Sequence, residues 1–188
     1  MRTDFGKKTF LYPMPVLIIG TYNEDGTPNA MNAAWGGIYN DNQICICVAS
    51  SHKTTINLKA RKAFTVSMAD AKNIAACDYV GLVSGKEVPD KIKKAGLTPV
   101  KSSKVDAPYF EELKMTLECE MVSYDDKTEQ LIGNIINISA DDSVITDGKI
   151  DVEKLQPVTY DSVNHKYRVI GNAVADAFAV GKEIKSPL

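Results

Sequence analysis

The stretch VLIIGTYNEDGTPNAMNAAW, residues 16–35, holds two strand-like runs with a turn between them. The first run, Val16 to Tyr22, is apolar and rich in β-branched residues, and the second extends from Ala30 to Trp35. Between them lies Asn23-Glu24-Asp25-Gly26, whose Asp-Gly pair readily supplies a residue with positive φ. The stretch therefore predicts a β-hairpin.

Strand-like runs recur along the rest of the chain. They extend from Gln43 to Ala49, Ala63 to Met68, Met115 to Tyr124, Gln130 to Ser139 and Lys166 to Ile170. Apolar and polar residues alternate from Met115 to Met121, which is typical of a strand with one buried face and one solvated face. Because helices do not alternate regularly with these strands, a parallel doubly wound sheet is disfavoured. We expect a mainly β protein, an antiparallel Greek-key barrel with a few helices at its rim.

The first of three predicted helices follows the strand that ends at Ala49. Ser51 is suited to cap its start, and the helix would run to about Lys62. Helical spacing would place Ile56, Ala60 and Ala63 together on one face. This face is expected to pack on the barrel.

Two further helices are predicted in the middle of the chain. One begins after Asp70 and ends near Gly81, a residue suited to a left-handed cap. The other extends from Pro89 to Ala95 and is closed by Gly96. It lies within a long excursion between strands, Gly85 to Pro108, and such excursions are often functional covers.

Length, charge and cysteine content narrow the class of protein. At 188 residues the chain is expected to form one domain, residues 1–188. The net charge is −2 and the cationic residues are scattered, so nucleic acid is not an expected partner. The first residues, Met1 to Lys8, are charged, and no window approaches the ~20 apolar residues of a membrane span, so we expect a soluble cytoplasmic protein. The four cysteines, Cys45, Cys47, Cys77 and Cys119, are expected to be buried free thiols.

Several common kinds of active site have no support in the sequence. Only two histidines occur, His52 and His165, and neither has a zinc-binding context, so no metal site is expected. The stretch Gly81 to Glu87 is one residue too short for a phosphate-binding P-loop and has Glu where a hydroxyl is required. Neither a Gly-x-Gly-x-x-Gly fingerprint nor a Gly-x-Ser-x-Gly elbow is present.

A cluster of hydroxyl groups and a cation marks the start of the first predicted helix. It reads Ser50-Ser51-His52-Lys53-Thr54-Thr55-Ile56-Asn57 and directly follows a strand. Free backbone N–H groups, the helix dipole and Lys53 would meet at one point, which suits an anion such as a phosphate monoester. An ordinary helix start, with Ser51 as cap and Lys53 in solvent, would have the same sequence.

A second polar cluster, Asn29 to Gly37, lies on the second strand of the predicted hairpin. Asparagine is depleted in strands, and the small residues beside Asn29 and Asn32 would let a flat ligand approach the backbone. The alternative is an edge strand with polar residues in water and Trp35 in the core.

Four stretches of the chain together resemble flavin reductase-like proteins of the FMN-binding split-barrel group, most closely the flavoredoxin branch. They are Pro15 to Asn32 with its DGTPNAMN segment, the Ser-His-Lys-Thr-Thr segment, Asp78 to Gly85, and Leu155 to Asp161. The resemblance covers nearly the full chain and implies a split β-barrel that binds FMN.

The resemblance also implies which residues hold the flavin. The phosphate would lie at the turn formed by Ser50, Ser51, His52, Lys53 and Thr54, with Asn57 close by. The isoalloxazine would lie along the strand of Asn29, Met31, Asn32, Ala33, Ala34 and Trp35. Ser84 and Gly85 would approach the flavin or its ribityl chain.

A homodimer and a redox activity are further implications of this resemblance. Hydride from NADH or NADPH would reach the flavin N5, and no side-chain nucleophile would be needed. Some relatives carry a histidine in a late barrel strand, but residues 131–139 contain none, which weakens the case for an efficient NAD(P)H:flavin reductase. A flavoredoxin-type electron carrier served by a redox protein partner, a non-enzymatic protein that stores FMN, and a barrel that has lost its cofactor remain open alternatives.

Overall fold

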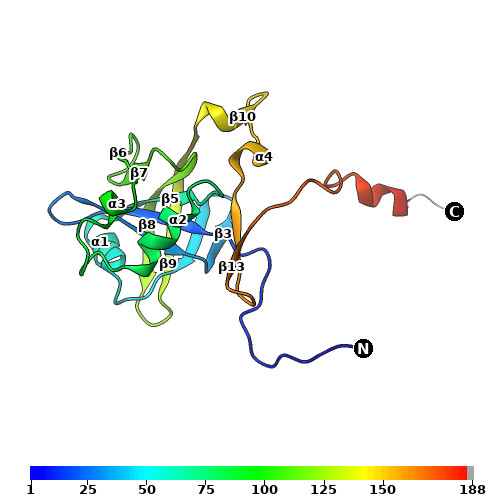
Figure 1. The fold of residues 1–188 in the computed structure, drawn as a ribbon, viewed down its shortest axis with the longest axis horizontal. Coiled ribbons are helices and arrows are strands. Elements are labelled where there is room, and N and C mark those ends of the chain that lie inside the picture. The colour runs from blue at the N-terminus through cyan, green and yellow to red at the C-terminus, as the bar shows by residue number, and fades with distance from the viewer. Residues whose placement is uncertain (186–188) are drawn as a thin grey trace.

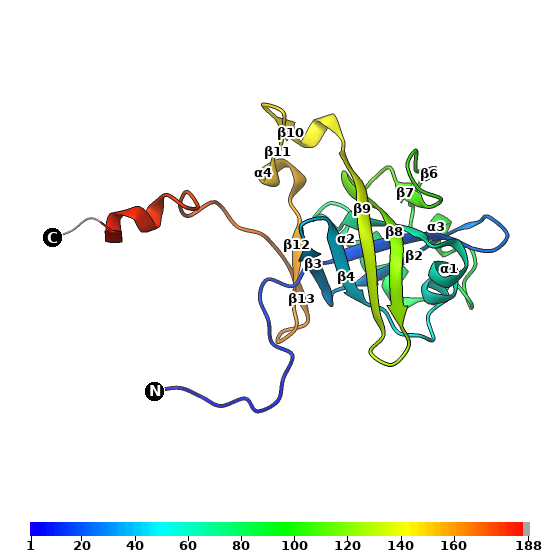
Figure 2. The same cartoon turned by 180° about the vertical axis from the view of Figure 1, so that it is seen from behind.

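A curled antiparallel sheet forms the body of the protein in the computed structural model, which describes residues 1–185 (Figures 1 and 2). Its seven strands lie in the order β2-β1-β5-β8-β9-β4-β3. Their bounds are β1 Leu17–Tyr22, β2 Pro28–Ala33, β3 Gly36–Asn40, β4 Gln43–Cys47, β5 Ala63–Met68, β8 Met115–Asp125 and β9 Gln130–Ala140. The mainly β split barrel predicted from the sequence is confirmed.

The hairpin predicted at residues 16–35 is present as β1 and β2, paired from Leu17 opposite Ala33 to Tyr22 opposite Pro28. Its turn has Gly26 at φ +82°. The Asp25 carboxylate accepts hydrogen bonds from the Thr27 N–H at 2.9 Å and the Thr27 hydroxyl at 2.6 Å. Local turn chemistry therefore accounts for this part of the fold.

The other predicted strands also form, with ends that shift by one or two residues, and β3 is the main omission. Because β3 begins with Gly36 and Gly37, its composition gives no strand signal, and its pairing with β4 defines it. Trp35, predicted as the end of a strand, lies between β2 and β3.

The helices are α1 (Lys53–Arg61), α2 (Ile74–Leu82), α3 (Lys91–Lys94) and α4 (Val152–Leu155). The cap predicted at Ser51 is wrong, because His52 is the N-cap residue of α1 and its side chain makes no capping hydrogen bond. The left-handed cap predicted at Gly81 is also wrong, because Gly81 lies inside α2, which ends at Val83 in an extended conformation. Gly96 does adopt a positive φ, +73°, after α3.

The buried face of α1 differs from the predicted one. Ile56 is 48% exposed, and Ala60 is exposed as well. The buried residues are instead Thr54, Thr55, Asn57 and Leu58. Helical spacing alone misses this face because three of its four side chains are polar and find hydrogen-bond partners beneath the helix.

Two apolar clusters lie on opposite faces of the sheet. One fills the curl of the barrel around Phe64, Ile46 and Leu131. The other joins the outer face of β1 and β2 to α2 through residues such as Ile18 and Val80. The second cluster therefore holds α2 against the two strands of the first hairpin.

The outer face of β8, predicted to be solvated, is buried over its first half. Thr116 and Glu118 are 2% and 3% exposed. The segment that carries β6 (Pro99–Lys101) and β7 (Pro108–Phe110) covers them, and the Ser102 hydroxyl donates a hydrogen bond to Glu118. This part of the long excursion therefore covers polar groups of the sheet, and a functional role for the excursion stays a prediction.

The four cysteines are free, as predicted, but only two are buried. Burial raises the pKa of Cys77 and of Cys119 to about 12. Cys45 is half-buried and Cys47 is exposed, because both lie on the outward face of β4.

The last part of the chain forms small elements around the barrel and then leaves it (Figures 1 and 2). They comprise the 3-10 helix η1 (Asp142–Val144), the hairpin of β10 (Ile145–Thr146) and β11 (Lys149–Ile150), and the hairpin of β12 (Val158–Asp161) and β13 (Lys166–Val169). The 3-10 helix η2 (Val180–Lys185) lies in an arm directed away from the sheet. Within residues 1–185, no helix combines the length and apolar character needed to cross a membrane.

Candidate functional site

The start of α1 presents backbone N–H groups that no side chain caps. The turn after β4 leads into His52, whose backbone is extended and whose carbonyl accepts the N–H of Ile56. The N–H groups ahead of Ile56 have no partner within the helix because a helix begins without preceding carbonyls. The ordinary alternative, in which Ser51 satisfies them, does not hold, and the positive end of the helix dipole is open to an anion.

A pocket of 320 Å³ lies directly beside this helix start, and we call it the α1 pocket. Nine residues predicted for the cofactor site line it: Asn29, Met31, Asn32, Ser51, His52, Lys53, Thr54, Ser84 and Gly85. The remaining lining residues, Val80, Gly81, Leu82, Val83 and Lys91, come from α2, its end and α3. The structure therefore brings three separate predicted segments to one place.

Two predicted residues have other positions. The backbone N–H and hydroxyl of Ser50 donate to the Glu129 carboxylate at 2.7 and 2.9 Å, so Ser50 faces the β8–β9 turn. Asn57 is 2% exposed beneath α1 and does not line the pocket. Its role in the structure is to fix the helix.

Buried amides and hydroxyls join α1 to the first hairpin, and we call this set the polar seam. Asn57 donates to the Thr21 hydroxyl at 3.0 Å and to the Asn23 side-chain oxygen at 2.9 Å. Asn29 donates to the Thr54 hydroxyl at 2.9 Å. Because buried polar groups are costly without partners, these bonds define one position for the helix start over β1 and β2.

Two glycines allow α2 and the loop after it to approach β2 closely. A Cβ atom on Gly81 would lie 2.8 Å from the Asn32 Cβ, and one on Gly85 would lie 2.6 Å from the Asn29 side-chain oxygen. A larger residue at Gly81 would have to move the backbone, and one at Gly85 would have to displace the buried Asn29 amide. The narrow shape of the pocket therefore depends on Gly81 and Gly85.

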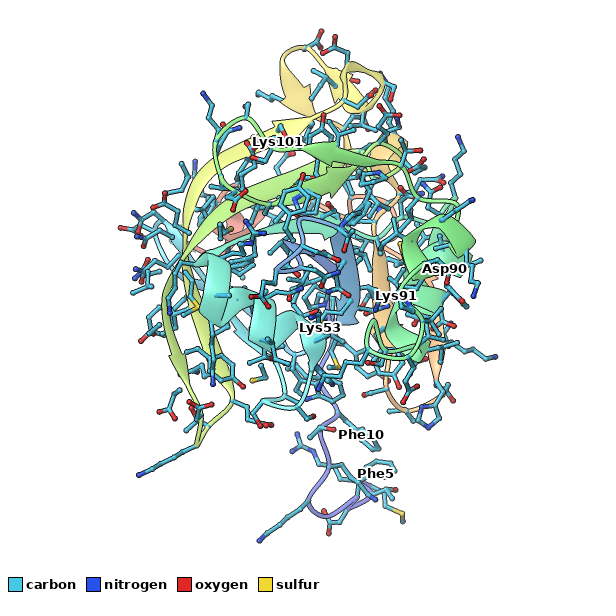
Figure 3. The ribbon with its side chains drawn as sticks, turned by 90° about the vertical axis from the view of Figure 1, so that its left-hand side faces the viewer. Phe5, Phe10, Lys53, Asp90, Lys91 and Lys101 are labelled. Atoms are coloured by element: carbon cyan, nitrogen blue, oxygen red, sulfur yellow. The ribbon has the colours of Figure 1, made fainter. Side chains whose placement is uncertain are left out.

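The α1 pocket is cationic. Lys53 and Lys91 both line it, and no Asp or Glu does so among the described residues. Lys91 is only 3% exposed and donates to the carbonyl oxygens of Val80 and Val83, each at 3.0 Å. Figure 3 shows Lys53 at the start of α1 and Lys91 on the neighbouring α3 segment. Burial lowers the pKa of Lys91 to about 8, because its ammonium group loses hydration.

A wider groove of 480 Å³ continues from the α1 pocket, and we call it the Trp35 groove. The two share Met31, Asn32, His52, Gly81 and Leu82. Ala33, Ala34 and Trp35, the remaining residues predicted along this strand, line the groove and not the pocket. The pocket and the groove therefore form one continuous site along β2.

The far wall of the Trp35 groove is the β12–β13 hairpin. Tyr160, His165 and Tyr167 line it, and the Tyr160 hydroxyl lies 3.0 Å from the His165 Nδ1. The Tyr167 hydroxyl donates to the Asp78 carboxylate at 2.6 Å. Burial, together with this hydrogen bond, raises the pKa of Tyr167. The groove thus has an aromatic wall tied to α2.

Asp161 lies at the turn end of this hairpin. Its carboxylate accepts hydrogen bonds from the Tyr12 hydroxyl at 2.6 Å, from Arg168 Nε at 2.8 Å and from the Asn164 amide at 2.9 Å. These donors, Tyr12 foremost, keep the pKa of Asp161 well below its ordinary value. The hairpin is therefore anchored to the N-terminal segment.

Sequence reasoning missed the hairpin wall and the buried lysine. The stretches that contain Asp78, Gly81 and Tyr160 carry the family resemblance, but the sequence indicates no role for these side chains. The stretch Leu155 to Asp161 and the strand-like run Lys166 to Ile170 could have indicated a paired aromatic wall, since Tyr160 and Tyr167 lie opposite each other across β12 and β13. Lys91 gave no such signal, because a lysine in a short Lys-rich segment is usually solvated.

The arrangement suits a ligand with a phosphate at one end and a flat ring at the other. The α1 pocket offers N–H groups and two cations, and the groove offers small residues on one side and aromatic residues on the other. FMN has this shape and charge distribution. Within the described part of the chain, no group of three or more His, Cys, Asp or Glu residues could hold a metal ion.

Comparison with known proteins gives a consistent result. Residues 9–168 match the model of the flavin reductase like domain. The structure is similar to flavoredoxin of Desulfovibrio vulgaris (Miyazaki F), with a TM-score of 0.92 and 36% identity over 96% of this chain and 100% of that one. It is also similar to flavoredoxin from Methanosarcina acetivorans, with a TM-score of 0.88 and 25% identity over 98% and 99% of the two chains. In sequence, a protein of Aquifex aeolicus is 25% identical over 78% of this chain and 79% of its own length.

Proposed function

This chain belongs to the flavin reductase-like family, and from that premise we propose that it binds FMN and acts as an NAD(P)H-dependent flavin oxidoreductase. One observation carries the proposal. A cationic pocket at an uncapped helix start opens into an aromatic groove, so a phosphate and a flat ring can be held at the two ends of one site.

The α1 pocket supports binding of the FMN phosphate. Lys53, Lys91 and the N–H groups at the start of α1 can all donate to phosphate oxygens. The Lys91 ammonium has three N–H groups, and two of them reach the carbonyls of Val80 and Val83. The third is available to an anion in the pocket. Ser51 and Gly85 would lie beside the phosphate or the ribityl chain.

The Trp35 groove supports binding of the isoalloxazine ring. Asn32 is held by a hydrogen bond from its amide to the Cys77 carbonyl at 3.1 Å, so its position is set before any ligand arrives. Ala33 and Ala34 leave space beside β2, and Trp35 and Tyr160 bound the groove. These residues would place and shield the ring, while Tyr167 and Asp78 would hold the wall in position.

Bound FMN would supply the redox chemistry, accepting hydride from NADH or NADPH and passing electrons on. The residues of the chain would bind and orient both molecules. No histidine occurs at residues 131–139, but His165 reaches the groove from the opposite wall. Its contact with Tyr160 leaves its Nε2 as a group that could meet a donor molecule.

An absorbance spectrum and two titrations test the binding half of the proposal. We expect the purified protein to carry FMN or to take it up, and to bind riboflavin, which lacks the phosphate, at least tenfold more weakly. Equal affinity for FMN and riboflavin would contradict the proposal that the α1 pocket binds the FMN phosphate. A protein that stays colourless in excess FMN would contradict the whole proposal.

Anaerobic mixing with NADH or NADPH tests the reductase half. We expect bleaching of the flavin band on the ~1 to 1000 per second scale of enzyme turnover. A flavin that stays oxidised with both donors would instead support the second candidate, a flavoredoxin-type electron transfer protein reduced by a redox protein partner. The similarity to two flavoredoxins favours that candidate over FMN storage. A flavin that no donor reduces would favour storage.

A cytoplasmic location and a homodimer complete the proposal. Free cysteines, with Cys47 exposed, are typical of a reducing compartment. Light scattering on the purified protein tests the homodimer directly.

A further inference from the structure

A polar pocket lies on the outer face of β8 and β9, and we call it the Glu118 pocket. Its volume of 510 Å³ is within the roughly 300–1,000 Å³ of small-molecule sites. Among the described residues, none that lines it also lines the α1 pocket or the Trp35 groove. Figure 3 shows Lys101, which lines the Glu118 pocket, well apart from Lys53 and Lys91. The pocket is therefore separate from the candidate flavin site.

The Glu118 pocket contains a buried carboxylate. Glu118 is 3% exposed and lines the pocket. Its carboxylate accepts hydrogen bonds from the Ser102 hydroxyl and the Asn137 amide, which are both uncharged. It forms no ion pair with any lysine, arginine or histidine side chain that the structure describes. A carboxylate offers about four lone-pair sites, so Glu118 can accept further hydrogen bonds, and a buried anion is costly without a cation.

The groups around Glu118 are hydrogen-bond acceptors and apolar side chains. Asn137 uses its amide N–H toward Glu118, and its side-chain oxygen accepts no hydrogen bond among the described residues. Ser139 lies on the same face of β9 and brings a hydroxyl to the pocket. The half-buried Tyr109 ring and the buried Leu113 side chain also line it. A primary ammonium group needs acceptors for its three N–H bonds, and a ring face also attracts a cation.

The charges of the pocket favour a cation over an anion. Three carboxylates line it, from Glu111, Glu118 and Asp141, against two lysines, Lys101 and Lys114. The Lys114 ammonium already donates to the Asp141 carboxylate at 3.3 Å and to the Glu111 carbonyl at 3.1 Å. Within the described part of the chain, these carboxylates do not form a group that could hold a metal ion. An organic cation therefore suits the pocket better than a metal ion.

We propose that the Glu118 pocket binds a small organic cation through its primary ammonium group. The ammonium donates to the Glu118 carboxylate and the Asn137 side-chain oxygen, and the carbon chain lies against Tyr109 and Leu113. The ligand supplies the counter-charge that the described side chains do not give Glu118. This inference goes beyond the proposed function, because it needs neither a flavin nor a nicotinamide.

An NMR titration of the isotope-labelled full chain with butylammonium chloride tests the proposal. The buffer is phosphate, because Tris is itself a primary ammonium ion. We expect saturable shifts of the backbone amides of residues 116–118 and 137–139. Butyltrimethylammonium, which has no N–H group, and butanol, which has no charge, should each bind at least about tenfold more weakly. The affinity for butylammonium should be the same with and without FMN.

Four variants identify the groups that bind the cation. Glu118→Gln removes the charge and should weaken butylammonium binding by about tenfold or more. The matched control is Glu120→Gln, the same change at an exposed residue of β8 that does not line the pocket, and its affinity should equal that of wild type. Tyr109→Leu leaves the hydrogen bonds of Glu118 in place and should weaken binding about three- to tenfold. Lys101→Met should strengthen binding severalfold, because a competing cation is lost.

Three results would each overturn the proposal. They are the absence of saturable shifts near Glu118 in wild type, equal affinities of Glu118→Gln and Glu120→Gln, and tighter binding of butyrate than of butylammonium. Thermal unfolding reports whether each variant is folded. If Glu118→Gln does not fold, Tyr109→Leu and Lys101→Met decide, and unchanged affinity in both overturns the proposal. If wild type binds no FMN, the proposed function fails while this titration still decides the cation site.

Discussion

The two ends of the candidate site are built differently. At the α1 pocket, buried amides, hydroxyls and a buried lysine are each held by partners within the protein, and the shape depends on two glycines. At the Trp35 groove, the walls are more open, with Trp35 at 50% exposure and Tyr160 and Tyr167 only half-buried. The pocket is thus organised before a ligand binds, whereas the groove stays open. We therefore expect the α1 pocket to supply most of the ligand affinity and the Trp35 groove to give a second reactant access to the ligand.

Removal of the buried cation should have the largest effect. In Lys91→Met, FMN affinity should fall by roughly 10- to 100-fold, which corresponds to the ~1.5–3 kcal/mol of a hydrogen bond to a charged group. Riboflavin affinity should be unchanged because the lost partner is the phosphate. Fluorescence titration of both flavins measures this.

The matched control for this variant is Lys94→Met. Lys94 lies on the same helix, pairs with Asp90 at 3.0 Å and does not line the pocket. Its FMN affinity should equal that of wild type. If Lys91→Met weakened the binding of FMN and riboflavin equally, the pocket would have collapsed. The proposed difference between the α1 pocket and the Trp35 groove would then be contradicted.

The pKa of Lys91 predicts a pH dependence with opposite signs for binding and stability. A phosphate would restore the charged form, so FMN affinity should fall as pH rises above about 8, by up to about tenfold per pH unit. Without FMN, the unfolded chain holds this proton up to its ordinary pKa of 10.5 while the folded chain releases it near 8. Stability of the apoprotein should therefore rise with pH in that window.

Titrations and urea unfolding between pH 7 and 10 measure both trends. In Lys91→Met, FMN affinity and apoprotein stability should both depend less on pH. Any pH dependence that persists in this variant would come from other titrating groups.

A methyl group at Gly81 should affect both ends together. Gly81→Ala would force α2 away from Asn32, at a cost of about 1–3 kcal/mol for an overpacked site. FMN and riboflavin should both bind about tenfold more weakly, because Asn32 lines the pocket and the groove. Gly37→Ala is the control, since nothing lies within 4 Å of its added Cβ. Thermal unfolding and titration should separate the two variants.

The smallest effect is expected at the hairpin wall. Tyr167→Phe removes one hydrogen bond, to Asp78, and keeps the ring, so FMN affinity should change by less than about fivefold, in line with ~1 kcal/mol for such a bond. If the rate of flavin reduction by NADH falls by a larger factor than the FMN affinity, the hairpin wall helps to position NADH. A loss of affinity as large as that of Lys91→Met would contradict the assignment of affinity to the pocket.

The sequence predicts the parts of this molecule that depend on local patterns. The β1–β2 hairpin follows from Asp25 and Gly26, and the strands follow from runs of β-branched residues. The helix start with Lys53 could be located because strand, hydroxyl groups and cation arrive in order. Its placement beside β2 could not be derived from spacing and came from the resemblance.

Features that depend on contacts distant in sequence were missed. The buried face of α1 is mostly polar, so a search for apolar residues at helical spacing does not find it. Lys91 is buried only because the loop after α2 folds over it, and Tyr167 enters the groove only because β13 pairs with β12. β3 exists through its partner strand and has two glycines at its start.

The polar seam bears on any attempt to graft this anion-binding turn onto another scaffold. A helix that packs through leucines can slide or rotate slightly and keep most of its contacts. The α1 helix packs through Asn57 and Thr54, whose hydrogen bonds to Thr21, Asn23 and Asn29 are directional. Residues 50–58 transferred alone to another protein would lack the hydrogen-bond partners that the β1–β2 hairpin provides. The smallest portable unit is therefore the turn together with the hairpin beneath it.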